Sequence, residues 1–441
     1  MSVPATSTES HHSPLVLPAL FLLSLFAIGS TVVAQDCEIQ QITFGLDDLS
    51  LPGPPPSSSA DGRKTAFVSN FNLVGLNPNL YGQVYLHDMA SGTVQITQSS
   101  GRWNGWVTIS GNGDRVVFGS EDDLTGGNPD GNTEVFLYEV GSGQLSQITS
   151  TTNWFHSYLG LDDSGDALVM LSTSDPIGGN ADHSIEVFVL DLATMIFTQI
   201  TDTTNGQMWD PKISGDGSAI AFRSSSDLDP GVNLDGNKEL FLYRRNQPIV
   251  QITDTTSGIN DEADLDWSGQ RLVFTSDNDL VPSSNPDLNI EVFLWDQGIG
   301  FTQLTNTSGW APTYTPSIDD AGRLVTFVSG HDLVPGQNPF ELDHLFAWEA
   351  PTGEFTQITF GNDQPNVFPD VSGSGISIVF YSYGELVPGG NPTGDFQIFS
   401  RVCGLFRDNF VTRDLRRWST GTTVPRRPYS PAIGLSYRSK E

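Results

Sequence analysis

One tripeptide, Gln-Ile-Thr, recurs along this chain at a nearly constant interval. The copies begin at Gln41, Gln95, Gln147, Gln199, Gln251, Gln303 and Gln357, and Leu304 replaces isoleucine in the sixth. Successive glutamines are 54, 52, 52, 52, 52 and 54 residues apart. A fixed period near 50 residues predicts a repeat architecture, in which each repeat forms one supersecondary unit.

The second repeat indicates what that unit is. Its residues 107–109, 115–120 and 134–138 read as short strands, and a fourth strand contains Gln147. A Gly-Asn-Gly-Asp turn joins the first two strands. A longer loop, rich in Asp, Gly, Asn and Pro, joins the second strand to the third. Four antiparallel strands in about 50 residues predict a propeller blade.

Two further repeated positions give the number of blades. Each second strand ends in a serine, at Ser69, Ser120, Ser172, Ser224, Ser276, Ser329 and Ser382. Each third strand carries an aromatic residue, at Tyr85, Phe136, Phe188, Phe241, Phe293, Phe346 and Phe399, which we expect to pack between neighbouring sheets. The sequence therefore predicts an all-β fold, a seven-bladed β-propeller.

The order of the strands predicts how the ring closes. A fourth-type strand around Gln41 precedes the first blade, while the last blade stops after Phe399 without one. We therefore expect the N-terminal strand to complete the last blade, which removes the open sheet edges. Cys37 and Cys403 then lie at neighbouring strand ends and form a disulfide; the alternative is two unrelated thiols.

The chain ends differ from its body. An apolar run at residues 15–28, followed by Val32-Val33-Ala34, predicts a signal peptide over residues 1–34 and export to the periplasm or beyond the cell, without a transmembrane anchor. We expect the propeller at residues 37–403, followed by a basic, disordered tail at 404–441. The chain has 52 acidic and 20 basic residues. This balance argues against nucleic-acid or anionic-membrane partners, and we expect a monomer.

The repeat resembles the WD40-like propeller repeats of the TolB family. The resemblance rests on Gly111-Asn112-Gly113-Asp114, Val116-Val117-Phe118, Asp130-Gly131-Asn132-Thr133-Glu134-Val135-Phe136 and Gln147-Ile148-Thr149. It covers residues 38–402 and implies the propeller fold. It implies no particular function, because unrelated functions share a fold.

Three of the loops between second and third strands carry oxygen ligands at alternate positions. The candidate calcium ligands are Asp123, Asn128, Asp130, Asn132 and Glu134; Asp227, Asn233, Asp235, Asn237 and Glu239; and Asp279, Asn285, Asp287, Asn289 and Glu291. Calcium takes six to eight oxygen ligands and accepts such loops. The alternative is that a tight turn simply demands Asn, Asp and Gly.

The segments that link the blades are rich in aromatic residues. With nearby polar groups, the candidate ligand-binding residues are Trp103, Trp106, Trp154, His156, Trp209, Asp210, Asp261, Glu262, Trp310 and Tyr314, joined by Tyr158 and Phe368. An exposed aromatic patch would stack on sugars or clasp a peptide. The alternative is that these rings wedge between blades.

No catalytic motif is evident, and we name no catalytic residue. His156 is the histidine placed where a channel site would use it, and the histidines show no metal-ligand spacing such as His-Glu-x-x-His. We therefore predict an exported module that binds a protein or a glycan on its loop-rich face, with Ca²⁺ stiffening the loops. The alternatives are a polysaccharide lyase or hydrolase with its site at the channel mouth, and a structural envelope module.

Overall fold

The computed structural model describes residues 37–45, 54–152, 154–204, 207–309, 311–361, 365–392 and 394–403. The contact pattern separates residues 1–35 from residues 36–441, and the described residues all belong to the second unit. The predicted signal peptide and basic tail lie outside the described residues, as does Trp310. The described part of the chain contains no helix long and apolar enough to cross a membrane.

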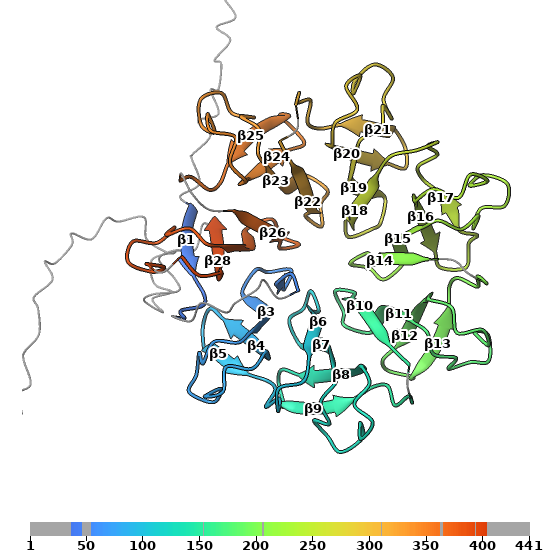
Figure 1. Cartoon of the computed structure of the whole chain (residues 1–441), viewed down its shortest axis with the longest axis vertical. Helices are drawn as coiled ribbons and strands as arrows, with labels where there is room; N and C mark the ends of the chain where they lie inside the picture. Colours follow the sequence, from blue (N-terminus) through green and yellow to red (C-terminus); the bar gives the residue numbers. More distant parts are fainter. Residues whose placement is uncertain are drawn as a thin grey trace, which may run out of the picture. The chain divides into compact units, whose positions relative to one another are not determined.

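The described residues form seven antiparallel four-stranded sheets around a central axis (Figure 1). Blades 1 to 3 are β2(Ser57–Ser58), β3(Lys64–Ser69), β4(Gln83–Asp88), β5(Gly92–Gln95); β6(Asn104–Ile109), β7(Arg115–Ser120), β8(Glu134–Glu139), β9(Gln144–Gln147); and β10(His156–Leu161), β11(Ala167–Ser172), β12(Glu186–Asp191), β13(Ile196–Gln199). Blades 4 and 5 are β14(Met208–Ile213), β15(Ala219–Ser224), β16(Glu239–Arg244), β17(Val250–Gln251); and β18(Asn260–Leu265), β19(Arg271–Ser276), β20(Glu291–Asp296), β21(Gly300–Gln303). Blades 6 and 7 are β22(Thr313–Ile318), β23(Leu324–Ser329), β24(His344–Glu349), β25(Glu354–Gln357); and β26(Asn366–Val371), β27(Ser377–Ser382), β28(Gln397–Cys403), β1(Cys37–Gln41). The predicted all-β, seven-bladed propeller is confirmed.

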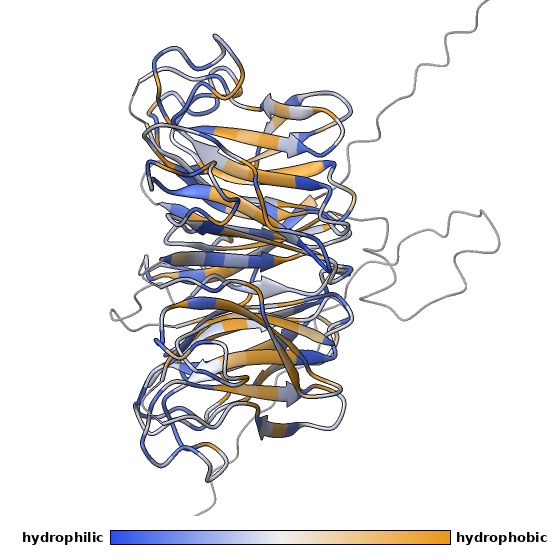
Figure 2. Ribbon diagram, turned by 90° about the vertical axis from the view of Figure 1, so that its right-hand side faces the viewer, coloured by the Kyte–Doolittle hydropathy of each residue, from blue (hydrophilic) through white to orange (hydrophobic). Residues whose placement is uncertain are grey.

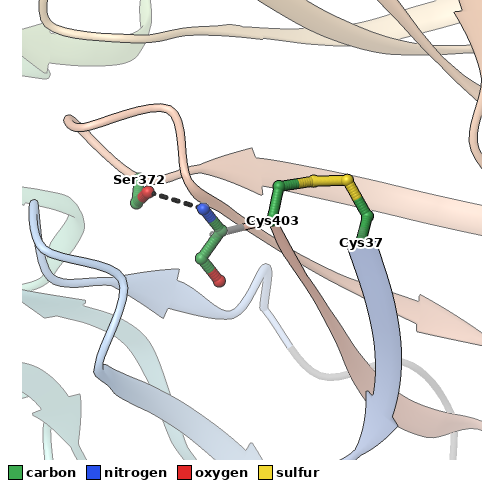
Figure 3. The surroundings of a disulfide bond; sticks show 4 residues. Cys37, Ser372 and Cys403 are labelled. Atoms are coloured by element: carbon green, nitrogen blue, oxygen red, sulfur yellow. Dashed lines mark hydrogen bonds between the residues drawn. A yellow bond between two sulfur atoms is a disulfide. The ribbon is translucent and has the colours of Figure 1, made fainter. Parts of the chain in front are cut away.

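The last blade closes the ring as predicted. Its strand order is β26-β27-β28-β1, so the first strand of the chain supplies the outermost strand of the final sheet. Cys37 pairs with Cys403 in the antiparallel register, with their Cα atoms 4.1 Å apart, and their sulfur atoms form a disulfide (Figure 3). The bond joins residues 366 positions apart, so it ties the two ends of the repeat array together.

The core lies between adjacent blades. Ala66 and Val84 of blade 1 pack against Val116 and Phe118 of blade 2 in one buried cluster, and the other clusters repeat this arrangement. The predicted third-strand aromatics are fully buried, and within blade 2 Phe136 stacks on Phe118 with ring centroids 5.8 Å apart. Figure 2 shows apolar residues concentrated in the strands and hydrophilic residues in many of the loops. Each sheet therefore depends on its neighbours for stability.

The recurring threonine of the tripeptide joins the third and fourth strands of every blade. In blade 2, the hydroxyl of Thr149 donates to the buried carboxylate of Glu134 and accepts a hydrogen bond from the backbone N–H of Val135. In each of the other blades, the equivalent threonine hydroxyl forms a hydrogen bond with a side chain of the third strand. These partners are Gln397, Gln83, Glu186, Glu239, Glu291 and His344. A buried polar group needs such partners, which explains why the motif recurs.

Candidate functional site

A cavity of about 400 Å³ runs along the propeller axis. It is lined by residues of β6, β10, β14, β18, β22 and β26, together with Pro54–Ser58 of blade 1. Figure 1 shows these strands as the innermost ones of their blades. Its volume lies within the range that small-ligand sites occupy in proteins.

A β-bulge interrupts the first strand of blades 2 to 7. The register shifts at equivalent places, for example between Ser157 and Gly160 in blade 3. One non-glycine residue at each bulge has a positive φ, between 46° and 56°: Trp106, Tyr158, Asp210, Glu262, Thr315 and Phe368. All six line the cavity. We call them the bulge ring.

The bulge ring lies towards the loop-rich end of the channel. The start of each first strand pairs with the end of the second strand, as His156 does with Ser172, and the second strand leads directly into the long loop. The bulge follows within three residues of that start. Residues in the left-handed region cost about 1–3 kcal/mol each, and such strain is concentrated at functional sites.

One side of the bulge ring is aromatic. Trp106 and Tyr158 contact each other with ring centroids 4.3 Å apart, and Trp103 packs edge-on against Trp106 at 6.0 Å. Trp103 is 39% exposed. Phe368 continues the aromatic side in blade 7. This apolar surface borders the cavity at blades 2, 3 and 7.

The opposite side, in blades 4 to 6, is polar. Arg223 of β15 forms ion pairs with both Asp210 and Asp261, so one guanidinium joins the first strands of two blades. A carboxylate oxygen of Glu262 accepts a hydrogen bond from the N–H of Thr315, 2.5 Å away in the next blade. Burial raises the pKa of Glu262, and the nearby carboxylate of Asp261 adds to that effect.

A ring of backbone hydrogen bonds surrounds the other end of the channel. Each turn between first and second strands bonds to the corresponding turn of the next blade, with N···O distances of 2.7 to 3.2 Å. The donor and acceptor residues are Ala60 to Gly111, Asn112 to Asp163, Asp163 to Gly215, Asp216 to Trp267, Trp267 to Asp320, Asp320 to Gly373 and Ser374 to Ala60. The seventh bond returns to the first blade, so the ring is complete.

Carboxylates gather near this turn end. Burial, reinforced by Asp163 and other nearby carboxylates, raises the pKa of Asp320 to about 7. Burial likewise raises the pKa of Asp370 to about 6, against hydrogen bonds from Ser58 that favour the charged form. Among the described lining residues, the carboxylates are Asp163, Asp210, Glu262, Asp264, Asp320 and Asp370, against one lysine, Lys212. The channel therefore attracts cations and repels anions.

Several candidate binding residues are engaged elsewhere in the fold. Trp154 stacks on His183 at 3.7 Å, and the ammonium group of Lys238 lies 4.2 Å from the ring centroid of Trp209. His156 is 1% exposed, and its Nε2 lies 3.7 Å from a carboxylate oxygen of Glu134. Burial lowers the pKa of His156. The hydroxyl of Tyr314 donates to Asp343 at 3.0 Å.

Other residues of the channel were not predicted from the sequence: Asp163, Lys212, Arg223, Asp264, Thr315, Asp320 and Asp370. The bulge ring could have been found from the repeat, because its members are 52 or 53 residues apart, close to the spacing of the tripeptide. Arg223 lies on a second strand and had no such signal.

The candidate calcium loops are held by many internal hydrogen bonds. Asp123, Asp227 and Asp279 accept hydrogen bonds from backbone N–H groups of their own loops. The carboxylates of Glu134, Glu239 and Glu291 are buried and bonded to threonines. Within the described ranges, no cluster of three or more His, Cys, Asp or Glu side chains could hold a metal ion.

Fold and channel together define a seven-bladed propeller with a ligand-sized cavity on its axis. The fold of the chain is that of a seven-bladed β-propeller, and its repeat motifs resemble those of the TolB family. No protein-family profile and no curated protein matches its sequence.

Solved structures share the fold at low sequence identity. Oligogalacturonate lyase from Vibrio parahaemolyticus is 11% identical, with a TM-score of 0.56, and the match covers 83% of this chain and 98% of the lyase. The propeller domain of the Trilobed protease from Pyrococcus furiosus is 12% identical, with a TM-score of 0.51 and coverage of 82% and 94%. TolB from Acinetobacter baumannii is 15% identical, with a TM-score of 0.42 and coverage of 69% and 66%. Likeness at these identities concerns the fold alone.

Proposed function

We propose that this protein is an exported binding module whose ligand, a protein segment or a glycan, enters the loop-rich end of the channel. The observation that carries the proposal is the bulge ring. Six blades hold a non-glycine residue in the left-handed conformation at the same position, and all six side chains line one cavity. Strain repeated in this way is retained where side chains must be aimed at a ligand.

The chemistry of the cavity narrows the kind of ligand. Trp106 and Tyr158 offer aromatic faces that stack on a sugar ring or an apolar side chain and attract cations. Across the channel, Asp210 and Glu262 line the cavity and offer carboxylate oxygens to hydroxyl or amine donors. A neutral or positively charged group therefore fits this cavity better than an anionic one.

Export is supported by the disulfide between Cys37 and Cys403, because such bonds persist in oxidising compartments. The periplasm and the extracellular space are both oxidising, and the disulfide is compatible with either.

The alternative, an enzyme acting on a polysaccharide, is supported by the fold shared with oligogalacturonate lyase. Two observations count against it. The carboxylates that line the channel repel an acidic sugar chain. In addition, His156, on which this alternative depended, is buried against Glu134 instead of lining the cavity.

A binding screen tests the proposal. The oxidised protein would be applied to arrays of neutral, amino and acidic oligosaccharides and to a peptide library. We expect binding to neutral or amine-bearing probes, at least about ten-fold weaker in the Trp106→Ala/Tyr158→Ala variant, because each aromatic contact contributes about 0.5–1.5 kcal/mol beyond the area it buries. Ile299→Ala is the control, since Ile299 is 79% exposed in the turn between β20 and β21, at the opposite end from the long loops.

A second variant separates loss of binding from loss of fold. Glu262→Gln keeps the acceptor for the N–H of Thr315 and removes the charge. We expect this variant to bind amine-bearing probes more weakly than wild type does, and to lose less affinity for neutral probes. Equal binding by wild type and both channel variants, or a preference for acidic oligosaccharides, would overturn the proposal.

A further inference from the structure

The seven loops between second and third strands are built around one asparagine each. These residues are Asn77, Asn128, Asn180, Asn233, Asn285, Asn338 and Asn391, and all are 3% exposed or less. In every loop the amide Nδ2 donates to the backbone carbonyl four residues later, at 2.8 to 3.1 Å. The amide is planar, so its Oδ1 lies inside the loop as well.

The Oδ1 atom of this asparagine has a hydrogen-bond donor in four of the loops. In blades 1, 6 and 7 the donor is the backbone N–H four residues later, in Tyr81, Leu342 and Asp395, at 3.1 to 3.2 Å. In blade 3 the hydroxyl of Ser184 lies 3.2 Å from this oxygen, and its one proton is shared with a carboxylate oxygen of Glu186 and the carbonyl of Thr203, each 2.7 Å away. These loops satisfy their buried acceptor within the chain.

The loops of blades 2, 4 and 5 differ. The Oδ1 atoms of Asn128, Asn233 and Asn285 are buried and have no hydrogen-bond partner among the described residues. These three loops also carry a second asparagine four positions later, Asn132, Asn237 or Asn289, and its Oδ1 is likewise buried without a partner in the described part of the chain. A buried acceptor without a donor costs about 1–3 kcal/mol, so six such atoms in three equivalent loops need an explanation.

We propose that each of these three loops binds one Ca²⁺ ion. The ligands are the two amide oxygens and the exposed carboxylate between them, Asp130, Asp235 or Asp287, with backbone carbonyls and water completing the shell. Calcium takes amide and carboxylate oxygens in flexible geometry, whereas Mg²⁺ demands near-ideal octahedral geometry and retains its water. The acidic body of the chain raises the local cation concentration.

Two groups of predicted ligands fall outside this narrower set. Glu134, Glu239 and Glu291 bond to the threonine of the tripeptide. Asp123, Asp227 and Asp279 bond to loop N–H groups, and Asp332 does the same in blade 6, where the second asparagine is missing. With one carboxylate per ion, the sites belong to the weak class of extracellular calcium modules, with Kd about 10⁻⁴–10⁻³ M.

The test compares loops within the same chain. The oxidised, full-length protein would be freed of metal, and Ca²⁺ binding would be followed by equilibrium dialysis and by thermal unfolding. We expect about three ions per chain, following the three loops with unpartnered oxygens. We expect a Tm that rises with Ca²⁺ and much less with Mg²⁺. The Asp130→Asn/Asp235→Asn/Asp287→Asn variant should bind Ca²⁺ at least ~10-fold more weakly, because each site loses its charged ligand.

Asp182→Asn is the matched control. Asp182 occupies the equivalent position in blade 3, where Ser184 replaces the second asparagine, so this change should leave Ca²⁺ binding unaltered. The exchanged residues are exposed, which keeps the variants foldable. Absence of bound Ca²⁺ in dialysis, an equal response to Mg²⁺, or an equal loss in the control would each overturn the proposal.

Discussion

The hydroxyl of Thr149 donates to the carboxylate of Glu134, and both side chains are buried between the third and fourth strands of blade 2. The same carboxylate accepts hydrogen bonds from the N–H and the hydroxyl of Thr151, at 2.5 and 2.8 Å. The threonine of the repeated tripeptide is therefore one member of a bonded cluster. It joins the chain just after the fourth strand, β9, to the start of the third strand, β8, beyond the last β8–β9 residue pair.

We predict that Thr149→Val will destabilise the propeller by about 1–3 kcal/mol, because it leaves a buried carboxylate oxygen and the N–H of Val135 without a partner. Urea unfolding measures the loss. The exposed neighbour Thr152 supplies the control, since Thr152→Val should change the free energy of unfolding by less than about 0.5 kcal/mol. Equal stability of the two variants would contradict this role for the cluster.

The disulfide should contribute strongly to stability. Because it closes a loop across 366 residues, the chain-entropy model gives it on the order of 6 kcal/mol. We expect Cys37→Ser/Cys403→Ser to unfold at lower urea concentration than wild type, and reducing agent to shift the wild type to the same midpoint while leaving the variant unchanged. A variant as stable as the oxidised protein would show that strand pairing alone closes the ring.

We expect the side chain of Arg223 at the channel mouth to contribute to the stability of the fold. Its substitution by leucine leaves the carboxylates of Asp210 and Asp261 without their cation. Breaking a buried ion pair costs about 3–5 kcal/mol, and partial exposure of these carboxylates reduces the expected loss to about 2 kcal/mol. Arg223→Lys should recover only part of it, since an ammonium group lacks the fork that bridges two carboxylates. Full recovery by lysine, measured by urea unfolding, would contradict this geometry.

Because the pKa of Asp320 is raised, we predict that its contribution to the stability of the folded protein decreases as the pH rises. Its pKa is raised from 3.8 to about 7, so the folded protein binds a proton that the unfolded chain has released between about pH 4 and 7. Its contribution to stability is therefore present below pH 4 and is lost as the pH rises through 7. Asp320→Asn should stabilise the protein at pH 8 by roughly 1–2 kcal/mol, after allowance for solvent screening, and much less at pH 4.

Unfolding curves of wild type and Asp320→Asn across that pH interval measure the effect. Asp114→Asn, at an exposed position outside the channel, is the control for removing one carboxylate. A difference between wild type and Asp320→Asn that stays constant with pH would contradict the raised pKa.

Much of the fold could be predicted because the tripeptide marks the same strand in every blade. The position of Gln41 before the first complete blade required the ring to close with the first strand, and that placed Cys37 beside Cys403. The candidate site was predicted less completely. Trp106, Asp210 and Glu262 do line the cavity, whereas Trp154 is stacked on His183. Sequence spacing locates a strand but does not tell which neighbour a side chain contacts.

The sequence by itself determined the number of blades, their strand order and the closure, because these depend on hydrophobic periodicity and on one repeated hydrogen-bonding motif. Only the tertiary structure decided what the channel contains. Closing the ring brings residues about 52 positions apart, such as Asp210 and Glu262, around one cavity, and the β-bulges turn them towards it. It also decided that Arg223 joins two blades and that Asn128 keeps a buried oxygen unpartnered among the described residues. Both depend on distances between loops and blades, which a repeat period does not encode.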